Sequence, residues 1–149
     1  MAIYFYTPGD EYGFLSNFAP YGVALADTYW PTVEHYYQAQ KFPHAPAHQA
    51  KIAQVRTPKQ AKALGWQRSI PLRPDWEAVK DGVMATALRQ KFHTHASLGE
   101  RLLATGDEVL IEAAPGDYYW GCGADGTGQN RLGQLLMAVR SDLRSTTAG

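Results

Sequence analysis

The segment WPTVEHYYQAQKF, residues 30–42, carries a carboxylate, an amide and an amine at helical spacing. Successive residues of an α-helix turn by about 100°, so Glu34, Gln38 and Lys41 fall within roughly 60° of one another. Their neighbours are mostly apolar or aromatic, so the polar stripe is narrow. Such a stripe indicates groups that line a cleft, where a carboxylate can transfer protons and an amine can attack an electrophile. The alternative is a half-exposed surface helix that carries a Glu–Lys pair.

A second segment, DYYWGCGADGTGQNR at residues 117–131, is typical of a loop that approaches a ligand. Its glycines allow close backbone approach, and a helix beginning near Asn130 would offer free N–H groups to an anion. Arg131 adds a bidentate donor for phosphate or carboxylate. The G-x-G-x-x-G spacing from Gly121 does not indicate a dinucleotide fold, because too few residues follow to complete a βαβ unit. The alternative is a turn-rich loop without a ligand.

The remaining reactive side chains do not form a site pattern. The histidines at 44, 48, 93 and 95 lack a supporting carboxylate or cysteine pattern, so neither a metal nor another cofactor is expected. We expect His35 to be packed or hydrogen-bonded rather than a ligand. The single cysteine, Cys122, excludes an internal disulfide framework and a Cys-rich zinc site, and no base lies beside it in the sequence.

The charge of the chain is balanced overall but uneven along its length. The 149 residues carry 14 basic and 14 acidic side chains, yet residues 41–80 hold eight basic and two acidic ones, a net +6. This block is either a set of solvated helix faces or a wall facing a phosphorylated ligand or a nucleic acid. No apolar run is long enough to span a membrane and no signal-peptide pattern begins the chain, so we expect a soluble cytoplasmic protein.

The elements that would position both segments are short strands and helices. Thr32 is placed to cap a helix, prolines open two more, and Gly65 and Gly106 end two. Without regular strand–helix alternation, the pattern predicts one helix-rich α+β domain over 1–149, with a core of about 3–143 and a frayed tail over 144–149. The expected strands are 2–6, 22–26 and 108–113, and the expected helices are 33–42, 46–56, 58–65, 75–92, 96–105 and one from about 130.

Four segments occur together in this chain: FLSNF at 14–18, WPTVEHYYQAQKF at 30–42, PLRPDWEAVKDGVM at 71–84 and DYYWGCGADGTGQNRLG at 117–133. In this order and spacing the chain resembles the YbiA-like, or NADAR, family from Tyr4 to about Leu143. Cys122 stands where an acidic residue is common in the family, and Leu15 replaces the usual residue before Ser-Asn-Phe. Neither departure falls on a position expected to be catalytic.

The resemblance implies a helix-rich α+β single domain with a small, short-stranded antiparallel sheet. It also implies an N-glycosidase that hydrolyses the ribosyl C1–N bond to an amino-substituted base. Members cleave ribosylamino-pyrimidine intermediates of riboflavin synthesis, or remove ADP-ribose from guanine bases in DNA or RNA. Some act as the antitoxin to a DNA-modifying ADP-ribosyltransferase, so such a toxin is the partner to consider. No membrane partner is expected, and the sequence does not indicate an oligomeric state.

The family's motifs place its catalytic residues at Glu34, Lys41, Trp76 and Asp117. Glu34 would transfer the proton and Asp117 would orient the ribose or water, although the two carboxylates can exchange roles. Lys41 would attack C1′ and form a transient Schiff base, and Trp76 would stack on or wall in the base. The expected ligand-binding residues, with Arg131 and the glycine loop holding phosphate, are Ser16, Asn17, Tyr37, Gln38, Arg73, Trp120, Gly121, Gly126, Gly128, Asn130 and Arg131.

Two alternatives from other classes stay open at this point. A module that binds ADP-ribose or nucleotides without cleaving them explains the aromatic residues, the glycine loop and Arg131. It gives no reason for Glu34, Lys41 and Asp117 to occur together. A non-specific nucleic-acid binder fits the basic block but not the zero net charge, and its affinity would fall steeply with salt.

Overall fold

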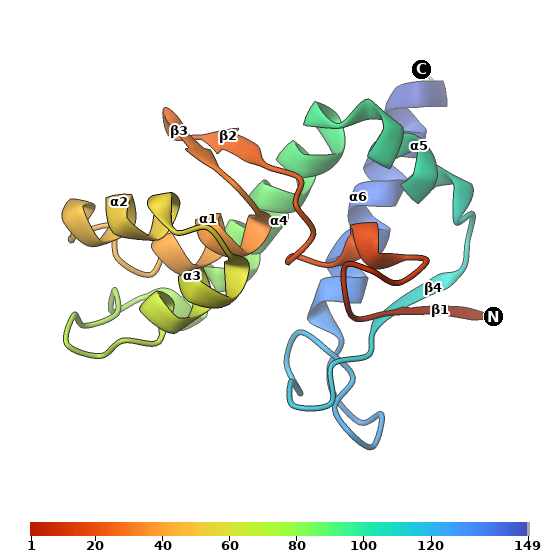
Figure 1. Ribbon diagram of the computed structural model, residues 1–149. Coiled ribbons are helices and arrows are strands. Elements are labelled where there is room, and N and C mark those ends of the chain that lie inside the picture. Colours follow the sequence, from red (N-terminus) through yellow and green to blue (C-terminus); the bar gives the residue numbers. More distant parts are fainter. Residues whose placement is uncertain (149) are drawn as a thin grey trace. The chain divides into compact units, whose positions relative to one another are not determined.

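The chain divides into two compact units (Figure 1). The computed structural model describes residues 1–148, whose elements form a central unit, Pro20–Lys91, and a terminal unit that joins Met1–Ala19 to the chain from Phe92 onward. The described residues contain six α-helices and two two-stranded sheets, which confirms the predicted helix-rich α+β class. The organisation as one domain over 1–149 stays a prediction.

In the central unit, β2 (Val23–Leu25) and β3 (Thr28–Trp30) form an antiparallel hairpin. Its two connecting residues, Ala26 and Asp27, have φ of +55° and +62°, as a type I′ turn requires. The sequence predicts the first strand, at 22–26, but not β3, because Ala-Asp is not the Asn-Gly pair that signals this turn. The antiparallel pairing expected for a small sheet is confirmed in this hairpin.

Three short helices of the central unit pack on one another: α1 (Val33–Ala39), α2 (Pro46–Gln54) and α3 (Pro58–Gly65). Local signals start them as predicted. The Thr32 hydroxyl accepts the His35 N–H at 3.2 Å at the beginning of α1, and prolines open α2 and α3. A side-chain cap, an initial proline or both therefore mark where each of these helices begins.

The first of these helices ends earlier than its sequence predicts. It stops at Ala39 rather than at residue 42, and the chain tightens into a turn in which the Lys41 N–H donates to the Gln38 carbonyl at 3.3 Å. All seven residues of α1 are buried. A helix with no exposed face must satisfy its polar side chains internally, so the half-exposed surface helix considered as an alternative is wrong.

The long helix α4 (Trp76–Thr94) agrees closely with the predicted 75–92. Trp76, Val79, Val83 and Ala87 recur at intervals of three and four along α4, but only Trp76 and Ala87 are buried, whereas Val79 and Val83 are half-buried. Met84 and Leu88 are buried as well. The buried face of α4 is therefore centred slightly to one side of this apolar stripe.

A lysine near the end of α4 is a buried group that the sequence does not single out. Lys91 has no exposed surface, and its ammonium lies 5.9 Å from the centroid of the Tyr21 ring. Burial lowers the pKa of Lys91 to about 7, against 10.5 for an ordinary lysine. Between these values the unfolded chain binds more protons than the folded one, so the free energy of unfolding rises with pH across this window.

The free energy of unfolding should therefore increase less between pH 6.5 and pH 9.5 in Lys91→Met than in the wild type. Methionine fills similar space without titrating. Urea unfolding at the two pH values measures the change. The exposed Lys59→Met is the matched control and should keep the wild-type dependence. An unchanged slope in Lys91→Met would show that Lys91 does not titrate in this window.

In the terminal unit, β1 (Ala2–Phe5) pairs with β4 (Val109–Glu112) in parallel. The predicted small antiparallel sheet is the β2–β3 hairpin, and this parallel pair is present in addition to it. Strands so far apart in the sequence are not joined by a hairpin, so nothing in the local sequence sets their relative direction. Figure 1 shows β4 beside α6 (Arg131–Ala148), and α5 (Ala96–Ala104) also packs on α6.

The described part of α6 extends through most of the predicted tail. Its backbone is helical to Ala148, so residues 144–148 continue the helix instead of fraying, and Gly149 lies outside the described residues. Along α6, the apolar residues Leu132, Leu136 and Val139 are buried. Among residues 1–148, no helix combines the length and apolar character that crossing a membrane requires.

Candidate active site

The polar stripe of α1 is buried in the central unit. Glu34 is 7% exposed and Gln38 is 2% exposed, and the Gln38 Nε2 donates to Glu34 Oε2 at 2.6 Å. The two side chains are four residues apart, so helical geometry alone brings them together. The amide holds the carboxylate in one orientation, which is what an acid–base group needs.

Lys41 lies in the turn that follows α1 and is also buried, with 4% of its surface exposed. Its ammonium lies within 6 Å of three aromatic ring centroids: Trp66 at 5.0 Å, Tyr37 at 5.8 Å and Trp76 at 5.9 Å. We call these three side chains the aromatic cage. An amine in such surroundings is partly stripped of water and faces the negative π-faces of the rings.

Burial and the neighbouring charged side chains together lower the pKa of the Lys41 amine. Burial is the main cause that lowers the pKa of Lys41 to about 8, and the positive charge of Arg68 is the next. Lys62 and Lys80 lower this pKa further, while the Glu34 carboxylate raises it. At neutral pH about a tenth of the molecules then carry an uncharged amine able to act as a nucleophile.

Several predicted site residues meet at the cage. Tyr37 and Trp76 contact each other edge to face, with centroids 5.1 Å apart, so Trp76 walls in the amine as one side of the cage. The backbone of Arg73 joins the group, since its N–H donates to the Lys41 carbonyl at 2.9 Å. Its guanidinium is already engaged by both carboxylate oxygens of Asp75, at 2.6 and 3.1 Å.

Trp66 and Arg68 also lie at this site, although the sequence motifs do not point to them. Trp66 is 60% exposed, and its ring lies 5.3 Å from the Arg68 guanidinium carbon as well as close to Lys41. The only local signal is an aromatic residue directly after the helix-ending Gly65, with a cation two positions on. Neither residue belongs to the motifs that carry the family resemblance.

Close packing between α1 and α3 holds this arrangement together. A Cβ built on Gly65 would overlap the Gln38 amide oxygen, and it would lie 2.6 Å from Gln38 Cδ and 2.9 Å from its Cβ. The absent side chain at Gly65 thus allows Gln38 to keep the position in which it bonds Glu34. Gly65 also directly precedes Trp66, so the contact between Gly65 and Gln38 also fixes the position of the Trp66 indole at the end of α3.

We expect Gly65→Ala to lower the free energy of unfolding by roughly 1–3 kcal/mol, the usual range for overpacking, and to reduce activity by displacing Gln38 from Glu34. Urea unfolding and turnover measure the two effects. Gly82→Ala is the matched control, because Gly82 is exposed on α4 and a Cβ there meets nothing within 4 Å. Alanine at position 82 should be neutral or stabilising, by up to about 1 kcal/mol. Equal stability of the two variants would contradict the tight contact.

The other predicted site residues lie in the terminal unit. The Ser16 hydroxyl accepts the Phe18 N–H at 3.1 Å, so it shapes the turn that also contains Asn17. The Asp117 Oδ1 accepts two backbone N–H groups, from Tyr119 at 3.0 Å and Trp120 at 2.7 Å. These contacts give Ser16 and Asp117 a role in holding loop conformation.

The glycine segment is an ordered loop closed by backbone hydrogen bonds. The Gly128 N–H donates to the Cys122 carbonyl at 2.7 Å, and a Cβ at Gly128 would meet that same backbone. Gly126 has φ of +81°, a conformation that favours glycine. Gly121 is buried against Ala114 and the Glu112 carbonyl. Close backbone contacts thus favour glycine at 121 and 128, and the backbone conformation favours it at 126.

The expectation of free N–H groups at the start of α6 is wrong for its first residues. The N–H groups of Asn130, Arg131 and Leu132 donate to the loop carbonyls of Gly121, Tyr119 and Trp120, at 2.9 to 3.1 Å. The loop folds back on the helix end and satisfies these donors itself. An anion would therefore meet side chains here, not these three backbone donors.

Asn130 and Arg131 have visible partners in this region. Asn130 has φ of +52°, and its side chain bridges to β4, accepting the Glu112 N–H at 3.0 Å and donating to the Leu110 carbonyl at 2.9 Å. The Arg131 guanidinium donates to Gln134 Oε1 at 2.9 Å on the surface. Asn130 thus fixes the loop to the sheet, and ligand binding by Arg131 stays a prediction.

The histidine prediction is confirmed for His35, which is packed and hydrogen-bonded. Its ring nitrogens lie 2.8 Å from the Thr32 hydroxyl and 2.9 Å from the Val55 carbonyl, and burial lowers the pKa of His35. The ring thereby ties the start of α1 to the end of α2. His48 likewise lies 3.0 Å from the Leu64 carbonyl at the end of α3.

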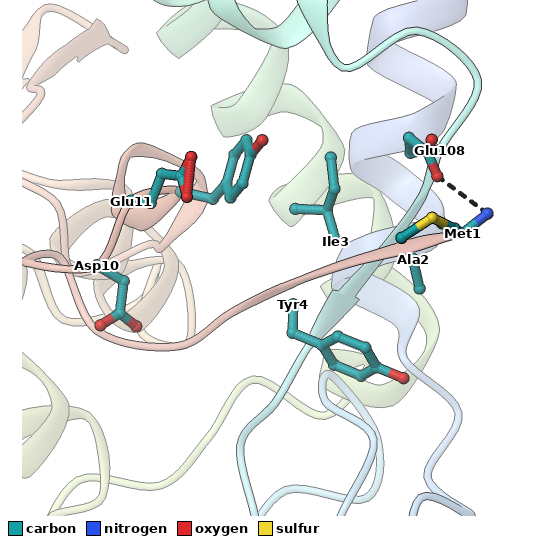
Figure 2. Close-up of a pocket in the computed structure, with 8 residues that line it drawn as sticks. Met1, Ala2, Ile3, Tyr4, Asp10, Glu11 and Glu108 are labelled. Carbon is teal, nitrogen blue, oxygen red and sulfur yellow. Dashed lines mark ion pairs between the residues drawn. The ribbon is translucent and has the colours of Figure 1, made fainter.

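A surface hollow of about 560 Å³ lies elsewhere, in the terminal unit (Figure 2). It contains none of the predicted site residues, and Figure 2 shows the N-terminal amine paired with Glu108, at 3.1 Å. Its volume does not by itself indicate function, since the reactive groups gather in the central unit. Its lining residues are Met1, Ala2, Ile3, Tyr4, Asp10, Glu11, Tyr12 and Glu108.

Comparison with known proteins connects this geometry to one family. The family model described as the NADAR domain matches residues 4–144. An N-glycosidase of Nostoc punctiforme is 50% identical, over 97% of this chain and 94% of its own. A riboflavin biosynthesis protein of Vibrio vulnificus is 42% identical, over 95% of this chain and 38% of its own.

A solved structure agrees with the same assignment. The Escherichia coli N-glycosidase YbiA is 48% identical over 95% of this chain and 88% of its own. Its NMR structure aligns with a TM-score of 0.90 at 46% identity, covering 99% of this chain and 87% of that one. A family match over nearly the whole chain, with relatives at this identity, is decisive: the chain belongs to the NADAR domain family.

Proposed function

We propose that this protein is an N-glycosidase that hydrolyses the ribosyl C1′–N bond to an amino-substituted base. The observation that carries the proposal is the buried group of Glu34, Gln38 and Lys41, in which an oriented carboxylate accompanies an amine of lowered pKa inside an aromatic cage. The names of the Nostoc and E. coli relatives support the same reaction class. A module that only binds nucleotides would not need a poised amine.

In the proposed first step, the uncharged Lys41 amine attacks C1′ and the C1′–N bond breaks. The bonding electron pair goes to the nitrogen of the departing base. The Glu34 carboxylate takes the proton that the attacking amine loses and gives it to that nitrogen. Tyr37 and Trp76 exclude water from the amine and give a flat apolar wall for the sugar or base.

In the second step, the sugar ring opens. The Lys41 nitrogen forms a C=N bond to C1′ as the C1′–O4′ bond breaks, and O4′ takes a proton from solvent. Water then adds to C1′, the carbinolamine collapses, and the free sugar and the lysine amine are released. One water is consumed overall, as hydrolysis of the glycosidic bond requires.

Two substrate classes fit this chemistry. A 5-phosphoribosylamino-pyrimidine is supported by the name of the V. vulnificus relative, a riboflavin biosynthesis protein. ADP-ribose on a guanine base of nucleic acid presents the same C1′–N bond with more phosphate. The cations Lys62, Arg68 and Lys80, which lower the pKa of Lys41, favour a phosphorylated substrate of either class.

A product assay on both substrates tests the proposal, with wild type and Glu34→Ala. Cleavage of the pyrimidine compound alone would identify an enzyme that removes riboflavin intermediates. Release of ADP-ribose from a modified oligonucleotide, lost in Glu34→Ala, would identify a nucleic-acid repair enzyme or an antitoxin to an ADP-ribosyltransferase. If neither bond is cut while ADP-ribose still binds, the protein is a binding module and the catalytic roles are wrong.

A further inference from the structure

The three rings of the aromatic cage differ sharply in exposure. Tyr37 is 7% exposed and Trp76 is 5% exposed, so both belong to the interior of the central unit. Trp66 is 60% exposed, although its ring centroid is the closest of the three to the Lys41 ammonium, at 5.0 Å. Of the three cage rings, only the Trp66 indole combines contact with the amine and broad contact with solvent.

The backbone of Trp66 is held firmly. It is the C-terminal cap of α3, and its N–H donates to the carbonyls of Lys62 at 3.1 Å and Ala63 at 3.2 Å. The preceding Gly65 packs directly against Gln38 of α1. Since the backbone is fixed at the α1–α3 contact, the position of the indole above Lys41 follows from the packing of these two helices.

A second cation lies at the same indole. The Arg68 guanidinium carbon is 5.3 Å from the Trp66 ring centroid, and its Nη1 donates to the Gly65 carbonyl at 2.9 Å, at the end of α3. Lys41 and Arg68 repel each other, which is one cause of the lowered pKa of Lys41. A π-face close to both cations offsets part of that repulsion while the ring surface keeps water away.

We propose that Trp66 is a positioning residue for Lys41: its indole shields the amine from water on the solvent side of the cage and so keeps it ready to attack. The inference rests on the proposed role of Lys41 as the attacking amine. Trp66 is assigned no bond to substrate, because its described contacts are with Lys41 and Arg68. Trp66 acts on the reaction by limiting the contact of the Lys41 amine with water.

The direction of the effect follows from two opposed contributions. The π-face attracts the charged ammonium and alone would raise the pKa of Lys41, whereas exclusion of water disfavours the charge and lowers it. The amine has a lowered pKa with all three rings in place, and burial is the largest cause. For an exposed ring that covers the amine we expect dehydration to be the larger contribution, so removing Trp66 should move the pKa of Lys41 upward.

The other groups that act on this amine must stay constant in the test. They are Glu34 and Tyr37 on α1, Lys62 on α3, Arg68 after α3, and Trp76 and Lys80 on α4. None of them is substituted when Trp66 is changed, although Arg68 loses its contact with the ring. Phenylalanine at position 66 keeps an aromatic face, whereas alanine opens the cage to water.

The test follows the Lys41 Cε resonance by ¹³C NMR through a pH titration, without substrate, with the resonance assigned from Lys41→Arg. In Trp66→Ala we expect the pKa of Lys41 to rise by about one unit, which lowers the uncharged fraction at pH 7 about tenfold. Trp66→Phe should titrate close to wild type. Tyr29→Ala, which removes another exposed aromatic ring of the central unit, is the matched control and should not shift the titration.

Turnover supplies a second and separate readout. In Trp66→Ala we expect kcat at pH 7 to fall about tenfold and the loss to shrink at pH 9.5, where most of the amine is uncharged in both proteins. An unchanged or lowered pKa of Lys41 in Trp66→Ala would overturn the inference, whatever the activity. A raised pKa in a protein whose wild type cleaves neither substrate would leave the shielding by Trp66 standing and refute the proposed function instead.

Discussion

Borohydride added during turnover traps a covalent adduct between the sugar and wild-type protein, and Lys41→Ala forms none. This is the expected result if Lys41 attacks C1′, since reduction of the C=N bond makes the intermediate permanent. We expect kcat to fall roughly 10³-fold or more, because no other amine has its place in the aromatic cage. Mass spectrometry of the intact protein and of its peptides locates the adduct.

The rate of borohydride trapping should also increase with pH. Only the uncharged amine attacks, and burial lowers the pKa of Lys41 to about 8, so the rate rises as pH increases through 8 and then levels off. With a lysine of ordinary pKa, the trapping rate would continue to rise up to about pH 10.4. Lys59→Ala, an exposed lysine on α3, should trap as wild type does. An adduct that persists in Lys41→Ala would place the nucleophile elsewhere.

Glu34→Gln should lower kcat by roughly 10²- to 10⁴-fold, the usual contribution of a general acid. The neutral amide cannot give a proton to the departing base, yet its oxygen can still accept the Gln38 N–H, so the fold should be kept. The loss should be largest for substrates whose bases are poor leaving groups. Steady-state kinetics with a series of bases measures this dependence.

The matched control for this carboxylate is Glu100→Gln, an exposed position on α5 that should leave turnover unchanged. Wild-type turnover in Glu34→Gln would show that Glu34 does not transfer the proton. The two carboxylates would exchange their assigned roles if Asp117→Asn showed the leaving-group dependence and Glu34→Gln did not. Because Asp117 Oδ1 holds two loop N–H groups, thermal unfolding of Asp117→Asn must accompany its kinetics.

Much of the local structure could be predicted from the sequence because short-range physics determines it. The Thr32 cap, the prolines at the starts of α2 and α3, and the positive φ of Gly106 after α5 act within one turn of chain. The pairing of Glu34 with Gln38 is of the same kind, since a helix brings residues four apart together. Glu34, Lys41 and Trp76 were predicted by a different route, from their positions in the family motifs.

Elements with distant partners could not be predicted in this way. The parallel direction of β1 and β4 depends on strands more than one hundred residues apart, with no turn between them to signal it. The start of α6 was expected to offer free N–H groups, because the sequence does not show that the loop carbonyls of Gly121, Tyr119 and Trp120 would reach back to accept them.

Glu34, Gln38 and Lys41 could thus be proposed from residue type and spacing, whereas their burial and the lowered pKa of Lys41 depend on the folded structure. From the sequence pattern, a stripe of Glu34, Gln38 and Lys41 is also compatible with a solvent-exposed helix face. Packing of α1 against α2 and α3 buries it, and Trp66, twenty-five positions from Lys41, supplies the closest ring of the cage. Dehydration and neighbouring charge set the pKa of an amine, and both depend on residues that only folding brings near.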